Sequence, residues 1–395
     1  MPHTWQVEPG FEDYRGVAWY RRTFEAPRGW QNSAGRIEFE GVFHTAKIWA
    51  NGELAGEHVR KGYTAFMLDV THLLRCRQPN TIAVRVDNAF NEHMVPRGHS
   101  SDWAHDGGIY RPVSLLITPK TFVESVDVEA FPDLISGDGK LTITAQIRNT
   151  SSQTWTGRAF FRITDDQTGL TVLTRSDEEA LAVKSGATST AKFGATIAKA
   201  KLWHFDQPNL SRLIFSIASG QENHHVTTIF GIRKLETKGS VFYLNGERIR
   251  LMGVERMAGS NPEFGMAEPD RWITHDHDDL KNLNCVFTRV HWPQDKRVLD
   301  YCARHGILMQ SEIPTWGYDM FAGMGPEPDA DIMQNAVEQL REMVARDRNY
   351  PSIIALGLCN EIGGNRLLHR AAHLESEARA PSPCPLRYSR RWAVA

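Results

Sequence analysis

Short runs of alternating apolar and polar residues, separated by turn residues, fill the first part of the chain. Five such runs lie at residues 17–24, 36–42, 46–59, 81–86 and 112–118. Alternation with a period of two places one face of a β-strand in a core and the other in solvent. The pattern therefore predicts an all-β domain over residues 1–119, of the jelly-roll β-sandwich type.

The dipeptide Asn51-Gly52 interrupts the third of these runs. Both residues tolerate the positive φ angles that a two-residue type I′ turn requires. We therefore expect a tight β-hairpin at this point.

A second set of strand-like runs follows Pro119. They lie at residues 123–131, 140–149, 157–165, 187–197, 212–219 and 224–232. This spacing is typical of an immunoglobulin-like β-sandwich, predicted here over residues 120–233. The segment shows no concentration of acids and bases, so we expect it to act as a spacer.

The hydrophobic period changes after Gly239. Apolar runs at 249–254, 285–292, 306–313 and 352–359 alternate with segments of helical period at 269–284, 295–306 and 336–349. Alternating strands and helices indicate βαβ units with a parallel sheet. A complete (β/α) barrel has eight such units in about 250 residues. Four are visible, so residues 234–364 are predicted to form the first half of a TIM barrel.

The end of the chain reads differently. Residues 365–395 are rich in Arg, Ala, Pro and Ser and contain no strand-like run. Such a composition favours a disordered or aberrant tail.

Composition and charge exclude several classes of partner. The chain is 41% hydrophobic and 23% charged, with 45 Lys+Arg against 47 Asp+Glu and a net charge of -2. No large field would attract nucleic acid or anionic lipid. No apolar run approaches the roughly 20 residues of a membrane span, and the first residues lack the pattern of a signal peptide. We expect a cytoplasmic protein without nucleic-acid or membrane partners.

The cysteines, histidines and acidic residues of the sequence do not show the spacing of a metal site. The five cysteines are scattered and show no CxxC spacing, which favours reduced thiols over a zinc site. The run from His275 to Asp279 lies in a helical segment, where adjacent side chains point in different directions. We interpret it as a solvated helix face, with the acids in the early turns, and expect neither a metal nor a cofactor.

The strongest candidate for chemistry is Glu361. The apolar run at 352–359 ends in Asn360-Glu361, which two glycines follow closely. In a barrel strand this position is the carboxyl end, where barrel enzymes carry their active sites. A partly desolvated carboxyl group there can act as a general acid on a glycosidic oxygen. The alternative is a glutamate that only caps the next helix.

Several ordered motifs extend this interpretation. They read VAWYRRTF, EGVFHTAKIWANGELAGEHVRKGYTAFMLDVT and DGGIYRPVSLLI in the first domain, KLWHFDQPNLSRL in the second, and FGIRKLETKGSVFYLNGERIRLMGVER, TRVHWPQD, EIPTWG and GLCNE in the third. In this order they resemble glycoside hydrolase family two, over nearly the whole chain up to about Gly364. The resemblance implies a retaining exo-β-glycosidase of the β-galactosidase, β-glucuronidase or β-mannosidase kind, whose partner is a β-linked carbohydrate. It leaves a homo-oligomer open for complete relatives.

The resemblance also implies roles for single residues. Glu361 matches the family's acid/base, and Asn360 matches the asparagine before it. Arg256 matches an arginine of the first barrel strand and is a candidate for substrate binding, although Glu255 stands where the family usually has asparagine. Arg289 and His291 match the end of the second strand; they would either contact substrate or form a buried pair with a barrel carboxylate.

Three further residues are candidates for substrate binding. Asp102 lies six residues before Gly108, where the family's jelly roll reaches an aspartate into the active site; a solvated loop acid is the alternative. Glu312 and Trp316 fall at the mouth of the third strand. There they could supply a polar group and an aromatic platform for a sugar, although Trp316 could equally be a packing residue.

One part of the family's machinery has no match. The nucleophile of the family is a second glutamate near the end of the seventh strand, and the sequence ends at Ala395, too soon after Glu361 for that strand. We therefore expect a fragment or frameshifted product that is inactive by itself. The alternative function is a non-catalytic carbohydrate-binding or vestigial protein. The sequence does not indicate which sugar is recognised.

Overall fold

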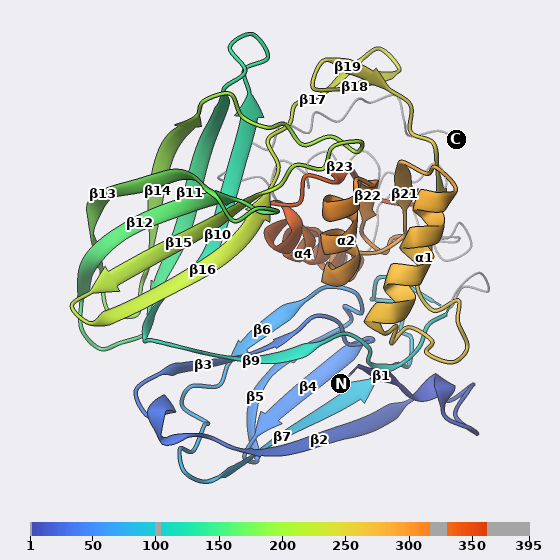
Figure 1. Cartoon of the computed structure of the whole chain (residues 1–395). Coiled ribbons are helices and arrows are strands. Elements are labelled where there is room, and N and C mark those ends of the chain that lie inside the picture. Colours follow the sequence, from blue (N-terminus) through green and yellow to red (C-terminus); the bar gives the residue numbers. More distant parts are fainter. Residues whose placement is uncertain (1, 99–103, 317–329, 362–395) are drawn as a thin grey trace.

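Three structural units make up the described part of the chain (Figure 1). The computed structural model describes residues 2–98, 104–316 and 330–361. Two of the units are β-sandwiches and the third contains parallel strands with helices. The predicted fold class, a jelly roll and an immunoglobulin-like sandwich followed by a partial α/β barrel, is confirmed.

The jelly roll packs two antiparallel sheets face to face, in the strand orders β2-β7-β4-β5 and β6-β3-β9, with β1 and β8 as an additional pair. Its strands are β1 His3–Thr4, β2 Val17–Glu25, β3 Ala34–Phe39, β4 Thr45–Ala50, β5 Glu53–His58, β6 Phe66–Asp69, β7 Pro79–Asp87, β8 Gly108–Ile109 and β9 Val113–Thr118. Ile48 and Val86 point into the core with alternate residues of their strands. The expected hairpin joins β4 to β5, with φ of 55° at Asn51 and 91° at Gly52.

The second sandwich has sheets in the orders β10-β11-β14 and β13-β12-β15-β16. Its strands are β10 Thr121–Pro132, β11 Gly139–Asn149, β12 Trp155–Asp165, β13 Thr171–Val183, β14 Thr188–Ile197, β15 Ser211–Ser219 and β16 Glu222–Phe230. Phe161, Phe193 and Phe215 contact one another edge to face in its core. The sequence pattern did not predict β13.

A small sheet of β17 Leu235–Lys238, β18 Val241–Leu244 and β19 Glu247–Ile249 leads into the α/β unit. There four parallel strands lie in chain order. The elements are β20 Gly253–Glu255, α1 Asp270–Asn282, β21 Phe287–Arg289, α2 Lys296–His305, β22 Leu308–Glu312, α4 Ala330–Asp347 and β23 Ile353–Gly357. No helix in the described ranges is both long and apolar enough to cross a membrane.

The expected position of the acidic run on the first helix is wrong. Because α1 begins at Asp270, residues 276–279 lie in its second half, not in its early turns. The face is not simply solvated either. His277 is buried against the core, and Asp276 forms an ion pair with Arg256.

Both ends of α2 have identifiable capping residues. The Asp295 side chain accepts a hydrogen bond from the backbone N–H of Arg297 at the N-terminus. Gly306 ends the helix with φ of 71°. A Cβ atom at residue 306 would lie 1.9 Å from the carbonyl oxygen of Phe205, so only glycine allows this approach of the barrel to the second sandwich.

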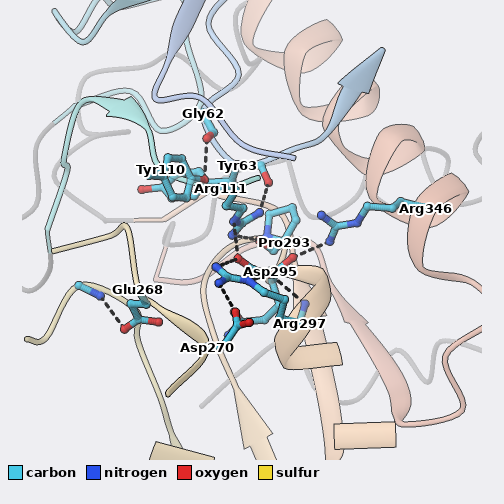
Figure 2. Close-up of polar contacts among 12 residues, drawn as sticks. Gly62, Tyr63, Tyr110, Arg111, Glu268, Asp270, Pro293, Asp295, Arg297 and Arg346 are labelled. Carbon is cyan, nitrogen blue, oxygen red and sulfur yellow. Dashed lines mark hydrogen bonds and ion pairs between the residues drawn. The ribbon is translucent and has the colours of Figure 1, made fainter. Parts of the chain in front are cut away.

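Arg111 connects the jelly roll to the barrel. Its side chain is 3% exposed and donates to the carbonyl oxygens of Tyr63 at 2.8 Å and Pro293 at 2.7 Å. Its Nε lies 4.0 Å from the carboxylate of Asp295, which also pairs with Arg297 at 2.7 Å (Figure 2). The guanidinium thus fixes the loop after β21 against the jelly roll.

A second contact between these units centres on Glu342 of α4. Its carboxylate accepts hydrogen bonds from Thr64 and from Lys61, the latter at 2.7 Å, and lies 3.3 Å from Nε2 of His58. All three partners belong to the jelly roll. The jelly roll therefore covers α4 as well as the β21 loop.

The second sandwich contacts the barrel through main-chain groups. The Asn349 side chain donates to the carbonyl oxygen of Val126 at 2.8 Å and accepts from the N–H of Val128 at 2.9 Å. The Trp203 indole N–H donates to the carbonyl oxygen of Ala303 at 2.9 Å. Helices and loops of the barrel unit therefore contact both sandwiches.

Acid should destabilise the jelly roll through His44. Burial lowers the pKa of His44 to about 4, from an ordinary value of 6.5, because desolvation outweighs the Asp87 charge and the hydrogen bond to the Ala89 carbonyl oxygen, which favour the protonated ring. The unfolded chain then binds more protons as the pH falls below 6.5, so stability decreases with falling pH. Between about pH 7 and pH 5 the native chain should lose about 2 kcal/mol more unfolding free energy than His44→Gln in urea melts.

The exposed His72 supplies the control for this comparison. His72→Gln should keep the pH dependence of the native chain. Equal pH dependence in His44→Gln and the native chain would contradict the buried, neutral His44.

Candidate active site

Polar side chains from three neighbouring parallel strands meet at one edge of the sheet. Arg289 ends β21, Glu312 ends β22, and Asn360 follows β23. Nη2 of Arg289 lies 3.1 Å from Oε2 and 3.2 Å from Oε1 of Glu312, and donates to Oδ1 of Asn360 at 2.8 Å. The carboxyl ends of parallel strands share an edge, which is why residues far apart in sequence converge here.

Glu312 is the centre of this cluster and is 0% exposed. Besides Arg289 it accepts a hydrogen bond from the Gln310 amide at 2.8 Å, and Nδ1 of His291 lies 3.4 Å from its Oε1. A buried carboxylate requires such partners, because unpaired charge in a low-dielectric interior costs several kcal/mol. Glu312 is therefore held in one position by the ends of two strands.

His291 extends the cluster to the first barrel strand. Its Nε2 lies 3.2 Å from the Glu255 carboxylate at the end of β20. Glu255, the residue that departs from the family pattern, thus has a polar partner in His291. All four parallel strands contribute to the edge.

A glycine makes room for the central carboxylate. A Cβ atom at Gly357, the last residue of β23, would lie 2.2 Å from Oε2 of Glu312. A side chain at residue 357 would have to displace the carboxylate or the strand. The glycine of the sequence IIALGLCNE therefore allows Glu312 to lie directly against β23.

Asn360 and Glu361 lie just beyond this edge. The N–H of Asn360 donates to the carbonyl oxygen of Thr315 at 2.8 Å, and the Thr315 hydroxyl donates to the carbonyl oxygen of Leu358. These bonds hold the chain after β23 against the segment after β22. Glu361 follows with φ of 54° and an exposed side chain. The partial desolvation that the sequence argument expected for this carboxyl group is therefore not found.

Trp316 is a packing residue. Its side chain is 1% exposed, and its ring centroid lies 5.8 Å from that of Trp292 and 5.9 Å from that of Tyr63. Tyr63 comes from the jelly roll, so the sandwich covers the ring that would have supplied a platform. Of the two interpretations of Trp316, the structure favours packing, because a covered ring has no free face for a sugar.

Arg256 does not join the cluster. Its guanidinium donates to both Glu268 oxygens at 2.8 and 2.9 Å and to Asp276 at 2.7 Å. The side chain is buried with Glu268 beside α1. Direct substrate contact, as expected from the sequence, is not what this geometry provides. Asp102 lies outside the described residues.

Two members of the cluster were missed by sequence reasoning. Gln310 could have been found from its spacing, because residues two apart on a strand share a face and Glu312 was already a candidate. The pairing of Glu255 with His291 gave no such signal, since the two residues lie on different strands.

The nearby thiol is not suited to nucleophilic chemistry. Burial raises the pKa of Cys359 to about 12, with the negative charge of Glu312 as a second cause. The thiol therefore stays protonated near neutral pH. No group of three or more His, Cys, Asp or Glu side chains in the described part of the chain is placed to hold a metal ion.

Comparison with known proteins places three family models along the chain in order. Residues 4–119 match the sugar binding domain of glycosyl hydrolases family 2, residues 121–233 match a second domain of that family, and residues 235–378 match its TIM barrel domain. The last match extends beyond the described residues.

The similar proteins are named as β-galactosidases or as β-glucuronidases. A β-galactosidase of Thermoanaerobacter pseudethanolicus is 33% identical over 91% of this chain and 46% of its own length. A β-glucuronidase of Bacteroides fragilis is 29% identical over 92% of this chain and 53% of its length. A solved β-glucuronidase of Bacteroides uniformis is 27% identical, covers 94% of this chain and 44% of its own, and has a TM-score of 0.82. The chain thus spans about half the length of these relatives.

Proposed function

This chain belongs to glycosyl hydrolase family 2, and we propose that its barrel edge forms part of the active site of a retaining exo-β-glycosidase. The observation that carries the proposal is the position of Asn360 and Glu361, directly after the fourth parallel strand and beside the Arg289–Glu312 pair. Barrel enzymes carry their catalytic groups at this end of the strands.

In the proposed mechanism Glu361 is the general acid and base. It protonates the departing glycosidic oxygen while a nucleophilic carboxylate attacks the anomeric carbon, and it then takes a proton from the water that hydrolyses the glycosyl-enzyme. The nucleophile would come from a later strand, with the two carboxyl groups about 5–5.5 Å apart.

Asn360 is proposed to bind a sugar hydroxyl beside the broken bond. Its Oδ1 accepts from Arg289, so the amide orientation is fixed and its Nδ2 hydrogens are left to donate. Arg289 and Glu312 are proposed to position Asn360 through their ion pair, with His291 in contact with Glu312. Their effect on the substrate would then be indirect.

The substrate is proposed to be a terminal β-glycoside. Relatives named as β-galactosidases and as β-glucuronidases both match, so the sugar is the first property to measure. A panel of p-nitrophenyl β-galactoside, β-glucuronide and β-mannoside should be tested on a full-length enzyme in which this sequence continues through the remaining barrel strands. Hydrolysis of one of them, with retention at the anomeric carbon, supports the proposal, and inversion would contradict it.

A polypeptide limited to these 395 residues should hydrolyse aryl β-glycosides negligibly. The reason is that a retaining mechanism needs two carboxyl groups, and the resemblance assigns the nucleophile to the seventh strand of the barrel. The measurement is release of p-nitrophenol, with Glu361→Gln as the control. Turnover by the 395-residue chain that Glu361→Gln abolishes would overturn the expectation.

A non-catalytic carbohydrate-binding role is the second candidate, because the chain carries two β-sandwiches ahead of its four parallel strands. The two candidate functions predict different results for the full-length protein tested on the panel of glycosides. Sugar binding without hydrolysis of any member of the panel would favour the non-catalytic role.

A further inference from the structure

The outer face of the jelly roll carries a hollow far from the barrel edge. Strand β2, at the bottom of the view in Figure 1, lies on the side of the jelly roll away from the barrel strands. The hollow has a volume of about 720 Å³ and opens on the sheet β2-β7-β4-β5. Trp19 and Trp49 line it together with two arginines.

The two tryptophans form an exposed aromatic surface. Trp19 on β2 is 61% exposed, and its ring centroid lies 5.3 Å from that of Trp49 on β4, with an angle of 36° between the planes. Ala83 on β7 lies in register with Trp49 and supplies only a methyl group between β2 and β4. The surface is therefore broad, apolar and uncovered, whereas large aromatic side chains are usually more than half buried.

The charges in the hollow are not balanced. Arg21 and Arg75 line it, and within the described ranges neither guanidinium has an ion-pair partner. On the same sheet Lys47 pairs with Glu57 at 2.9 Å and Arg85 pairs with Asp87 at 3.1 Å. Two unpaired guanidiniums beside an aromatic surface favour an anionic ligand that also has an apolar face.

The hollow also has a rigid rim. The Asn51 amide donates to the carbonyl oxygen of Leu73 at 2.7 Å and to Oδ1 of Asn80 at 2.9 Å, and Oδ1 of Asn51 accepts from the N–H of Thr81. Asn51 thus holds the rim in place, and its side chain is not the group that recognises a ligand. This fixed geometry reduces the ordering cost of binding.

We propose that this hollow binds an acidic oligosaccharide, at a site separate from the barrel edge. The C–H faces of sugar rings pack on Trp19 and Trp49, and the carboxylate or sulfate groups of the ligand receive hydrogen bonds from Arg21 and Arg75. The site would keep the chain attached to an anionic glycan while terminal residues are processed elsewhere. It does not depend on the proposed hydrolysis.

Isothermal titration calorimetry on the 395-residue chain tests the proposal with three probes. Tetragalacturonate carries carboxylates, a sulfated galacto-oligosaccharide carries sulfates, and cellotetraose is neutral. At least one acidic probe should bind about tenfold more tightly than cellotetraose, and added salt should weaken it. The comparison of the two acidic probes distinguishes uronate from sulfate recognition. Equal binding of all three probes would overturn the proposal.

Substitutions locate the binding. Trp19→Ala should weaken binding of the acidic probe about tenfold, and Arg21→Gln and Arg75→Gln about fivefold each. The control is Arg22→Gln, because Arg22 is also exposed but leaves β2 on the opposite face. It should leave binding unchanged. An acidic probe whose affinity does not change in any of the three site variants would show that the hollow is not its site.

A second copy of the chain is the competing occupant of an exposed aromatic face. Analytical ultracentrifugation of the native chain and Trp19→Ala distinguishes it. A native dimer that Trp19→Ala converts to a monomer, without binding of either acidic probe, would overturn the proposal. A sedimentation coefficient that Trp19→Ala does not change, together with the expected calorimetric series, supports it.

Discussion

Replacing Glu361 with alanine in a full-length enzyme should lower kcat about 10³-fold for β-glycosides with poor leaving groups. Without a proton donor the departing alkoxide is unstabilised, whereas an activated 2,4-dinitrophenolate leaves without one. The first chemical step should therefore slow much less for the dinitrophenyl glycoside than for an alkyl glycoside. Steady-state and burst kinetics on this pair of substrates measure the difference.

Azide should restore turnover of the Glu361→Ala enzyme on the activated substrate. The second step also lacks its general base, and azide attacks the glycosyl-enzyme without needing one, which gives a β-glycosyl azide with retained configuration. An α-glycosyl azide would instead make Glu361 the nucleophile. The exposed Glu263, which pairs only with exposed Arg271 in the described structure, supplies the control Glu263→Ala. Unchanged kinetics in Glu361→Ala would remove the basis of the assignment.

Replacing Arg256 with alanine should lower the free energy of unfolding by about 3–5 kcal/mol. Arg256 is 8% exposed, and its removal leaves the carboxylate of Glu268 buried without its cation. Urea unfolding followed by tryptophan fluorescence measures the loss. Arg271→Ala is the matched control, because its pair with Glu263 is exposed on both sides and should contribute less than about 1 kcal/mol.

A double variant separates two causes of the loss of stability: the lost attraction between Arg256 and Glu268, and the buried charge that a single substitution leaves without a partner. Arg256→Met combined with Glu268→Gln removes the buried pair together, so it should cost clearly less than the sum of the two single variants. Additive losses would mean that Arg256 and Glu268 do not interact in the folded chain. Equal losses in Arg256→Ala and Arg271→Ala would contradict the burial argument.

Strands with one buried face were the easiest to predict from the sequence. In β4 and β7 every second side chain is buried, so the period of two is visible in the sequence. Strand β13, which the sequence pattern missed, is an edge strand of its sheet, and most of its described side chains are exposed. Its run from Thr171 to Val183 therefore has no apolar alternation to detect, and its pairing with β12 follows from backbone hydrogen bonds.

The site was predictable where strand ends determine it. Arg289, Glu312 and Asn360 each follow an apolar run, and parallel strands carry such positions to one edge. The surroundings of Arg256 were not predictable. Its partners Glu268 and Asp276 come from the segment before α1 and from α1 itself, and the sequence pattern does not show which acids face the strand.

Contacts between domains are a second kind of feature that the sequence pattern did not show. Trp316 is a packing residue because the ring of Tyr63, from the jelly roll, lies against it. The pattern within one domain contains no information about such a distant neighbour. The domain contact through Arg111, visible in Figure 2, was equally hidden, since its acceptors are main-chain oxygens.

The contact of Asn349 with β10 covers part of an exposed sheet edge. Strand β10 is at the edge of its sheet, where unpaired N–H and C=O groups can recruit a strand from another molecule. The Asn349 amide satisfies the carbonyl oxygen of Val126 and the N–H of Val128 together, as the peptide group of a neighbouring strand would. Arg348 adds a charge beside it through Asp127. The segment that follows α4 thus blocks part of an edge that would otherwise be open to intermolecular pairing.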